Sequence, residues 1–192
     1  MVSLHDGMTL FHGSYAPIGG IDLEKCATGK DFGRGFYLTS DKTQARSFIR
    51  TSLAKAKRIG IVAPDHQHGY ATAFRFNAPE PPLRTFEFPT ADSQWLRFVA
   101  LNRRKSLVEK LSVALDPALL NADVIIGKIA NDATNPVITA YLNGIYGVPQ
   151  SAEAAQITIG LLLPERLKDQ YCFLSERAVE CLQLIGVSHF ES

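Results

Sequence analysis

The segment GKDFGRGFYLTSD, residues 29–41, decides how the chain is interpreted, because a glycine-rich loop here runs directly into an ordered element. Its three glycines within seven positions permit positive φ angles and a close approach of the backbone to a ligand. A short apolar strand is expected at 36–39, and Ser40 or Asp41 is a suitable N-cap for a helix that ends at Arg58. Alone, the segment fits an ordinary flexible turn as well as a ligand-binding loop.

Two common phosphate-binding motifs do not match this loop. No Gly-Lys-Ser/Thr follows the glycines, as a Walker A motif requires. No strand leads directly into the loop, and an aromatic residue stands where the helix of a Rossmann fingerprint would open. Any ligand contact made by this segment therefore follows a different pattern.

The segment MTLFHGSYAPI, residues 8–18, has a short apolar strand at 8–12 that ends in His12-Gly13-Ser14. An isolated His-Gly-Ser fits a surface imidazole at a strand end. Together with the loop at 29–41, it offers an imidazole for a ribose hydroxyl and an exposed backbone amide after His12. Tyr37, and Phe48 on the inner face of the following helix, add aromatic faces for a flat heterocycle.

Strands and helices are mixed along the rest of the chain without a regular βαβ alternation, which favours an α+β fold over a doubly wound sheet. No repeat or long linker divides the chain, so we expect a single domain over residues 1–192. The further elements expected are strands at 69–76 and 83–88, a helix at 93–103, a buried strand at 122–130, helices near 137–143 and 152–161, a strand at 170–175, a helix at 176–185 and a strand or tail at 186–192.

The bulk composition is that of an ordinary globular protein, with 46% hydrophobic and 20% charged residues. The formal net charge of +1 gives no general attraction to nucleic acid or membranes, so any basic patch must be local. Three cysteines form neither a paired framework nor a metal-binding spacing, and those at 172 and 181 are expected to be buried thiols. No signal peptide or long apolar run is visible, so we expect a cytoplasmic protein unless a leaderless secretion system exports it.

Several segments resemble the ADP-ribosyltransferase superfamily. LFHGS and GRGFYLTSDKTQARSF are similar to the first two motifs of the diphtheria-toxin and poly(ADP-ribose) polymerase type, whose catalytic triad is His-Tyr-Glu. A bacterial family of uncharacterised domains grouped with these enzymes is more similar still, over GKDFGRGFYLTSDKTQA, WLRFVALNR, DVIIGKIANDAT and QYCFLSERAVECL. The resemblance covers residues 9–182 and implies a split β-sandwich, two small sheets flanked by helices.

The resemblance also implies roles for individual residues in binding NAD. His12 would hydrogen-bond the adenosine ribose, and the Gly13 backbone would hold the nicotinamide carboxamide. Tyr37 and Phe48 would sandwich the nicotinamide ring. Supporting contacts to NAD are implied for Ser14, Arg34 and Gly35. The chain departs from the polymerase pattern at Ala45, where that pattern has a carboxamide-binding serine.

The third motif departs from the triad, because the stretch DQYCFLSE places Gln170 where the resemblance implies the glutamate. In such a site the carboxylate stabilises the oxocarbenium-like ribose cation as nicotinamide leaves, and it anchors a ribose hydroxyl. A glutamine supplies a hydrogen bond but neither charge nor base. Losing one such electrostatic contact costs on the order of 10²-fold in rate.

Other carboxylates are candidates to compensate for Gln170. Asp169 is adjacent but points to the opposite face of a regular strand. Glu176 is also explained by the favourable helix dipole at a helix start. Asp132, in the Asn131-Asp132 pair, is otherwise an ordinary turn residue and stays a second-tier candidate.

Two basic clusters and one histidine pair have competing interpretations. The helix at 42–58 and the segment 102–106 carry cations that fit either a solvated helix face or a surface for NAD phosphates or a nucleic-acid acceptor. His66 and His68 stand in an H-x-H spacing without a further ligand nearby, so a loop is favoured and no metal is expected.

The resulting interpretation is a mono-ADP-ribosyltransferase with His12, Tyr37 and Gln170 as catalytic residues and NAD as its substrate. Its acceptor is a macromolecule, protein or nucleic acid. By analogy of fold, it would be a bacterial toxin or effector, with an antitoxin or immunity protein as a partner. The alternatives are a catalytically inactive domain that senses NAD or ADP-ribose, and an interaction module without a ligand.

Overall fold

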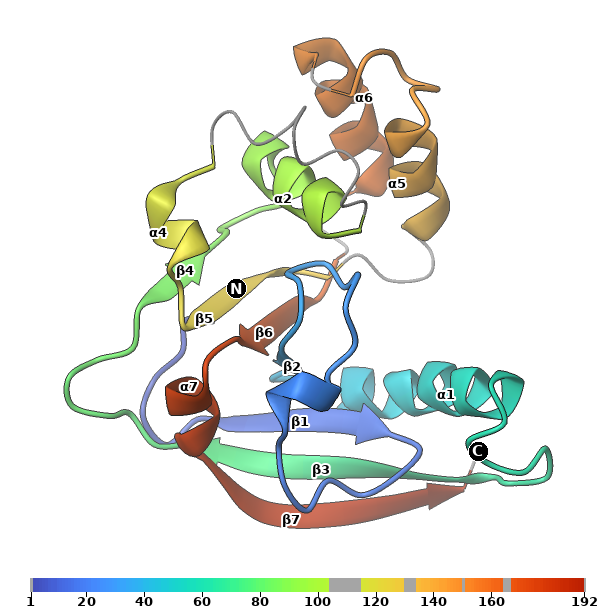
Figure 1. Cartoon of the computed structure of the whole chain (residues 1–192), viewed down its shortest axis with the longest axis vertical. Coiled ribbons are helices and arrows are strands. Elements are labelled where there is room, and N and C mark those ends of the chain that lie inside the picture. The colour runs from blue at the N-terminus through green and yellow to red at the C-terminus, as the bar shows by residue number, and fades with distance from the viewer. Residues whose placement is uncertain (1, 104–114, 130–133, 150, 164–166, 192) are drawn as a thin grey trace.

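Two small sheets and a set of helices form the α+β fold that the sequence predicts (Figure 1). The computed structural model describes residues 2–103, 115–129, 134–149, 151–163 and 167–191. An antiparallel sheet has the order β1 (Thr9–Ser14), β3 (His68–Phe76) and β7 (Leu182–Glu191). A mixed sheet has the order β2 (Phe36–Leu38), β6 (Asp169–Phe173), β5 (Val124–Lys128) and β4 (Thr85–Glu87).

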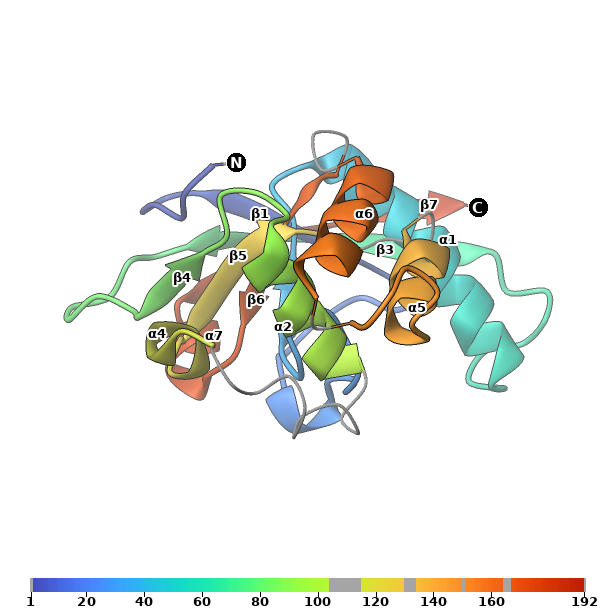
Figure 2. The ribbon, with the colours of Figure 1, turned by 90° about the horizontal axis from the view of Figure 1, so that it is seen from above.

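The helices lie mainly on the outer sides of the two sheets (Figures 1 and 2). Their bounds are η1 (Leu23–Lys25), α1 (Lys42–Arg58), α2 (Ser93–Arg103), α4 (Pro117–Leu120), α5 (Asn135–Leu142), α6 (Ala152–Leu162) and α7 (Glu176–Glu180). Of the two predicted N-caps, Ser40 and Asp41, the structure has Asp41, whose carboxylate accepts from the backbone N–H groups of Thr43 and Gln44. The short α4 is an element that the sequence analysis does not predict.

The four-stranded sheet separates two hydrophobic cores. One core lies between the two sheets, and the other lies between this sheet and α2, α5 and α6. Strand β6 shows the alternation: Tyr171 and Phe173 enter the core between the sheets, whereas Cys172 enters the core beneath the helices. All three side chains are fully buried, so this strand is central to the fold.

Two glycines bring α1 against the outer face of the three-stranded sheet. A Cβ at Gly13 would lie 1.9 Å from the carbonyl oxygen of Ala45, and one at Gly69 would lie 1.9 Å from Ile49 Cγ2. The helix backbone therefore lies closer to this sheet than any larger residue at these positions permits.

The two sheets meet where β1 passes β2. Phe11 and Thr39 form one antiparallel bridge, with backbone N···O distances of 2.8 and 3.0 Å in the two directions. The pairing does not continue beyond this bridge into Gly13 and Tyr37. This junction positions the site described below.

The prediction of a helix at 176–185 is wrong beyond residue 180. Helix α7 ends at Glu180, and β7 begins at Leu182 and pairs with the whole length of β3. The backbone hydrogen bonds along β3 outweigh the local helical pattern, since strand formation depends strongly on a partner far away in sequence. Cys172 and Cys181 are buried free thiols, as predicted.

A membrane-spanning helix is absent from the part of the chain that the structure describes, because none of its helices is both long and apolar enough.

Replacing Asp123 with asparagine is expected to destabilise the protein most at neutral pH. Arg84 donates to the Asp123 carboxylate from Nε and Nη2, each at 2.9 Å, and this pairing holds the pKa of Asp123 far below its usual range. The stabilisation is present above the unfolded-state pKa of about 3.9 and is lost as the pH falls toward the folded-state value. Urea unfolding at pH 7, 5 and 3 should show the difference from wild type shrinking with acidification. The exposed Asp65→Asn control should show no such trend.

Candidate functional site

His12 is fixed at the junction of the two sheets by its side-chain contacts. Its Nδ1 lies 2.8 Å from the backbone oxygen of Tyr37, and its ring stacks on Phe36 with centroids 4.8 Å apart. Since a carbonyl oxygen only accepts, Nδ1 carries the proton. Burial lowers the pKa of His12, so the imidazole is neutral at pH 7. Among the described residues, Nε2 makes no hydrogen bond and remains an acceptor.

The backbone of Gly13 faces the side of β1 on which pairing has stopped. In an antiparallel ladder, alternate residues direct both N–H and C=O to the same neighbouring strand. Phe11 directs both groups to Thr39, so Gly13, two residues later, directs its groups to the same side. No hydrogen bond to either group of Gly13 is found within the described parts of the chain. Gly13 therefore presents one donor and one acceptor side by side.

The Tyr37 ring is fixed by its hydroxyl, which donates to Gly33 O at 2.8 Å and accepts from Phe32 N–H at 2.9 Å. Burial raises the pKa of Tyr37 well above its usual range, so the phenol stays protonated. Phe48 is half-buried, and its Cβ lies 3.3 Å from the position that a Cβ on Gly13 would take. The ring of Tyr37 thus holds the glycine-rich loop in place, and Phe48 covers Gly13 from α1.

The proposed NAD-binding residues divide between two faces. The Phe11–Thr39 bridge places Gly13 and Tyr37 on one face, which Gln170 and Phe48 share. The His12 ring instead lies with Phe36 on the side of the core between the sheets.

The supporting residues are spread more widely. Ser14 is buried, and its hydroxyl accepts from the Ala16 N–H at 3.4 Å. Arg34 is exposed. Gly35 packs against β6, since a Cβ there would lie 2.6 Å from Cys172 Sγ. Ser14 and Gly35 therefore have evident packing roles.

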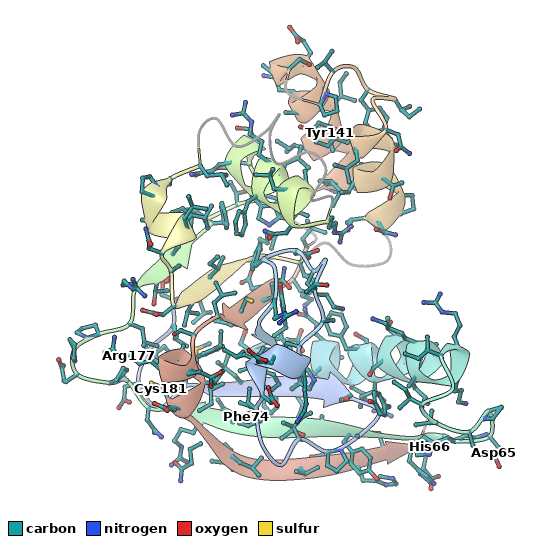
Figure 3. The ribbon with its side chains drawn as sticks, in the orientation of Figure 1. Asp65, His66, Phe74, Tyr141, Arg177 and Cys181 are labelled. Carbon is teal, nitrogen blue, oxygen red and sulfur yellow. The ribbon has the colours of Figure 1, made fainter. Side chains whose placement is uncertain are left out.

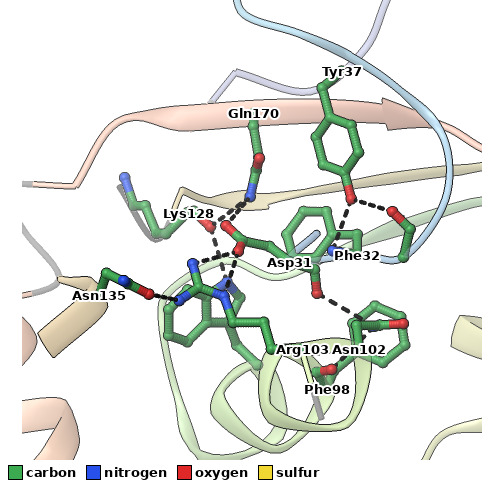
Figure 4. A network of polar contacts seen from close by, with 11 residues as sticks. Asp31, Phe32, Tyr37, Phe98, Asn102, Arg103, Lys128, Asn135 and Gln170 are labelled. Atoms are coloured by element: carbon green, nitrogen blue, oxygen red, sulfur yellow. Dashed lines mark hydrogen bonds and ion pairs between the residues drawn. The ribbon is translucent and has the colours of Figure 1, made fainter. Parts of the chain in front are cut away.

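Gln170 is buried, with 4% of its surface exposed, and its amide donates two hydrogen bonds (Figure 4). Nε2 lies 3.1 Å from Asp31 Oδ2 and 3.2 Å from the backbone oxygen of Lys128. Both N–H groups of the amide are therefore used. Gln170 is held rigidly in a polar network under α2.

Asp31 and Arg103 are the centre of this network. The sequence analysis did not single out Asp31, and it named Arg103 only as part of the basic segment 102–106. Arg103 Nε and Nη2 donate to Asp31 Oδ1 at 3.0 and 2.7 Å, and Arg103 Nη1 donates to Asn135 Oδ1 at 2.8 Å. Asn102 Nδ2 donates to the backbone oxygen of Asp31 at 3.3 Å. One signal was present in the sequence: Asp31 is the carboxylate within the glycine-rich loop.

Gln44 is a further polar residue that the sequence analysis did not single out. It is buried, its Oε1 accepts from the Thr39 hydroxyl at 3.1 Å, and its Nε2 has no hydrogen-bond partner among the described residues. In the sequence Gln44 directly precedes Ala45, the position at which the resemblance implies a lost serine contact.

The other candidate carboxylates have structural partners or lie elsewhere. Asp169 forms an ion pair with Lys128 Nζ at 2.8 Å. Glu176 is exposed in the first turn of α7, where the helix dipole favours an acid. Asn131 and Asp132 lie outside the described residues.

The cationic side chains of α1 are mostly exposed, with Lys57 half-buried, and no ion pair ties any of them to another described residue. They are Lys42, Arg46, Arg50, Lys55, Lys57 and Arg58. Arg46 lies over the ring of Phe190, 4.9 Å from its centroid. In the second basic cluster, the segment 102–106, Arg103 forms an ion pair with Asp31, and residues 104–106 lie outside the described parts.

Asp65 and His66 lie at the tip of the loop before β3, far from α2, α5 and α6 (Figure 3). They line a cavity of about 420 Å³ together with Ala63, Gln67, His68 and Glu191. No group of three or more potential metal ligands is found among the described residues.

Comparison with known proteins places the chain in a family. A family model described as "Protein of unknown function (DUF3990)" matches residues 8–184. No curated protein and no solved structure matches the chain. The matched segment runs from the start of β1 into the first residues of β7, and it includes the whole four-stranded sheet and the junction between the sheets. The chain therefore belongs to DUF3990, a family of unknown function.

Proposed function

We propose that this protein binds NAD and transfers a single ADP-ribose unit to a macromolecular acceptor, releasing nicotinamide. The observation that carries the proposal is the unpaired edge of β1 at Gly13. A carboxamide needs one hydrogen-bond acceptor and one donor next to each other, and the C=O and N–H of Gly13 supply both. Phe48 and Tyr37 stand beside this edge as aromatic surfaces for the nicotinamide ring.

The His12 ring lies on the opposite face from Gly13 and Tyr37, and we propose that this neutral imidazole contacts the adenosine half of NAD. Its Nε2 would accept a hydrogen bond from the adenosine ribose. Gln170 would contact the nicotinamide ribose, because it lies on the same face as Tyr37, two residues along β6 from the Tyr37 partner Cys172. Ser14, Arg34 and Gly35 remain proposed supporting residues.

The acceptor is proposed to be protein or nucleic acid. Cations in the first half of α1 oppose the helix dipole, and the i,i+4 pairs Lys42–Arg46 and Arg46–Arg50 repel each other. Helix stability therefore does not explain them, and contact with phosphates does. We place the protein in the cytoplasm and propose a toxin or effector role with a neutralising partner.

A second candidate function is an NAD- or ADP-ribose-binding domain without catalysis. It is favoured by the burial of Gln170 and Asp31, which leaves 4% and 7% of their surfaces exposed. A reactive ribose would have to reach these two buried groups, whereas a ligand that contacts only Gly13 and His12 would not.

Incubation with NAD is expected to raise the melting temperature and to release nicotinamide. Phe48→Ala should weaken NAD binding about tenfold, because it removes a ring that stacks on nicotinamide. The matched control is Phe190→Ala, a half-buried phenylalanine near the other side of α1, which should bind like wild type. Calorimetric titration measures the affinity.

Labelled NAD with cell lysate, treated or not with nuclease, identifies the acceptor class. Nicotinamide release together with transfer of the label to an acceptor supports the transferase. Tight NAD binding without nicotinamide release or label transfer supports the sensor. The absence of any NAD-dependent stabilisation at millimolar concentration would overturn both functions.

A further inference from the structure

We propose that the carboxylate of Asp31 supplies the negative charge that Gln170 lacks, an inference that rests on the proposed function. Asp31 Oδ2 lies 3.1 Å from Gln170 Nε2 (Figure 4). A carboxylate from the glycine-rich loop is therefore one hydrogen bond away from the position at which a glutamate is implied.

The surroundings of residue 170 explain why an amide stands there. Its Nε2 donates to two acceptors, the Asp31 carboxylate and the Lys128 carbonyl oxygen. A glutamate would bring a second carboxylate against Asp31 and could not donate to either acceptor when ionised. Of the two side chains Asp31 and Gln170, only Asp31 carries a negative charge, and Arg103 is its counter-cation.

The orientation of the ion pair directs this charge toward Gln170. Arg103 binds Oδ1 through two nitrogens, whereas Oδ2 faces the amide. Asn135 holds the guanidinium from its other side. Because the Asp31 carboxylate is buried, its electric field is screened less than it would be in water.

In the reaction, the bond between C1′ of the nicotinamide ribose and the nicotinamide nitrogen breaks. Its electron pair leaves with neutral nicotinamide, and the ribose becomes an oxocarbenium-like cation that the Asp31 charge stabilises. The acceptor nucleophile then forms a bond to C1′ and gives its proton to water.

The test measures nicotinamide release and NAD affinity on four purified proteins. Asp31→Asn is expected to lower release at least about 100-fold while NAD affinity stays within about threefold. Asp31→Asn/Gln170→Glu exchanges the two groups and keeps an amide–carboxylate hydrogen bond. This double variant should release nicotinamide at least about tenfold faster than Asp31→Asn. Lys128 O retains the Trp95 indole donor in this exchange.

Asp169→Asn is the matched control, because it removes a neighbouring carboxylate from an ion pair with Lys128. Its release should stay within about threefold of wild type. A purely structural role of Asp31 would not predict recovery in the exchanged variant. Should Asp31→Asn fail to fold, Asp31→Asn/Arg103→Gln removes both charges of the pair and should fold, bind NAD and lack release.

The outcomes separate the two proposals. Unchanged release in Asp31→Asn, or in the variant without both charges, overturns the role of Asp31 and leaves the transferase intact. Wild-type binding without release also overturns that role and leaves the NAD sensor. Wild type that neither binds nor cleaves NAD removes the proposed function itself.

Discussion

Replacing Gly13 by alanine is expected to lower the free energy of unfolding by about 3 kcal/mol. The added Cβ would lie 1.9 Å from the backbone oxygen of Ala45 and 2.8 Å from its carbonyl carbon. Neither atom belongs to a flexible side chain, so all of α1 must move away from the sheet. Chemical denaturation followed by circular dichroism measures the loss.

The matched control is Gly160→Ala, which adds the same methyl group inside α6. No atom of the described residues lies within 4 Å of that position. Alanine favours a helix by about 1 kcal/mol over glycine, so this variant should be more stable than wild type. Equal stabilities of the two variants would contradict the close approach of α1 to β1. The contrast also tests the junction itself, because Gly13 both packs against α1 and presents the unpaired edge.

Replacing Trp95 by alanine is expected to cost about 3–5 kcal/mol of stability. The side chain is fully buried in the core beneath α2, and its Nε1 donates to Lys128 O at 3.0 Å. The same oxygen accepts from Gln170, so the indole supports the polar network from the core. Trp95→Phe keeps most of the apolar contact and loses the hydrogen bond, for which we expect about 1–3 kcal/mol.

Leu120→Ala is the control for the tryptophan variants, since 65% of Leu120 is exposed. Its stability should stay within about 0.5 kcal/mol of wild type. Circular dichroism is the readout, because Trp95 is the single tryptophan of the chain. A Trp95→Ala protein as stable as Leu120→Ala would show that this core does not contribute as its burial implies.

Elements whose signals are local were predicted closely. Helix α2 has the predicted bounds, and α1 begins after the predicted Asp41 cap, because apolar spacing and capping act within a few residues. Strand β7 was mistaken for a helix over its first residues, because its partner β3 lies about a hundred positions earlier in the chain.

The candidate site was predictable in part. The motifs at His12, Gly13 and Tyr37 were visible as residue types at strand ends next to glycines. The network of Asp31, Arg103 and Gln170 was not, because it joins three segments that are far apart in sequence. A local sequence pattern does not predict which carboxylate will accept a hydrogen bond from the Gln170 amide.

By itself, the sequence determined that this chain mixes strands and helices, that α1 follows a glycine-rich loop, and that position 170 holds an amide. Only the tertiary structure decided where a charge lies beside that amide and which backbone edge stays unpaired. Element type follows from short-range spacing and capping, whereas the electrostatics of a buried group depends on neighbours that folding brings within a few ångströms.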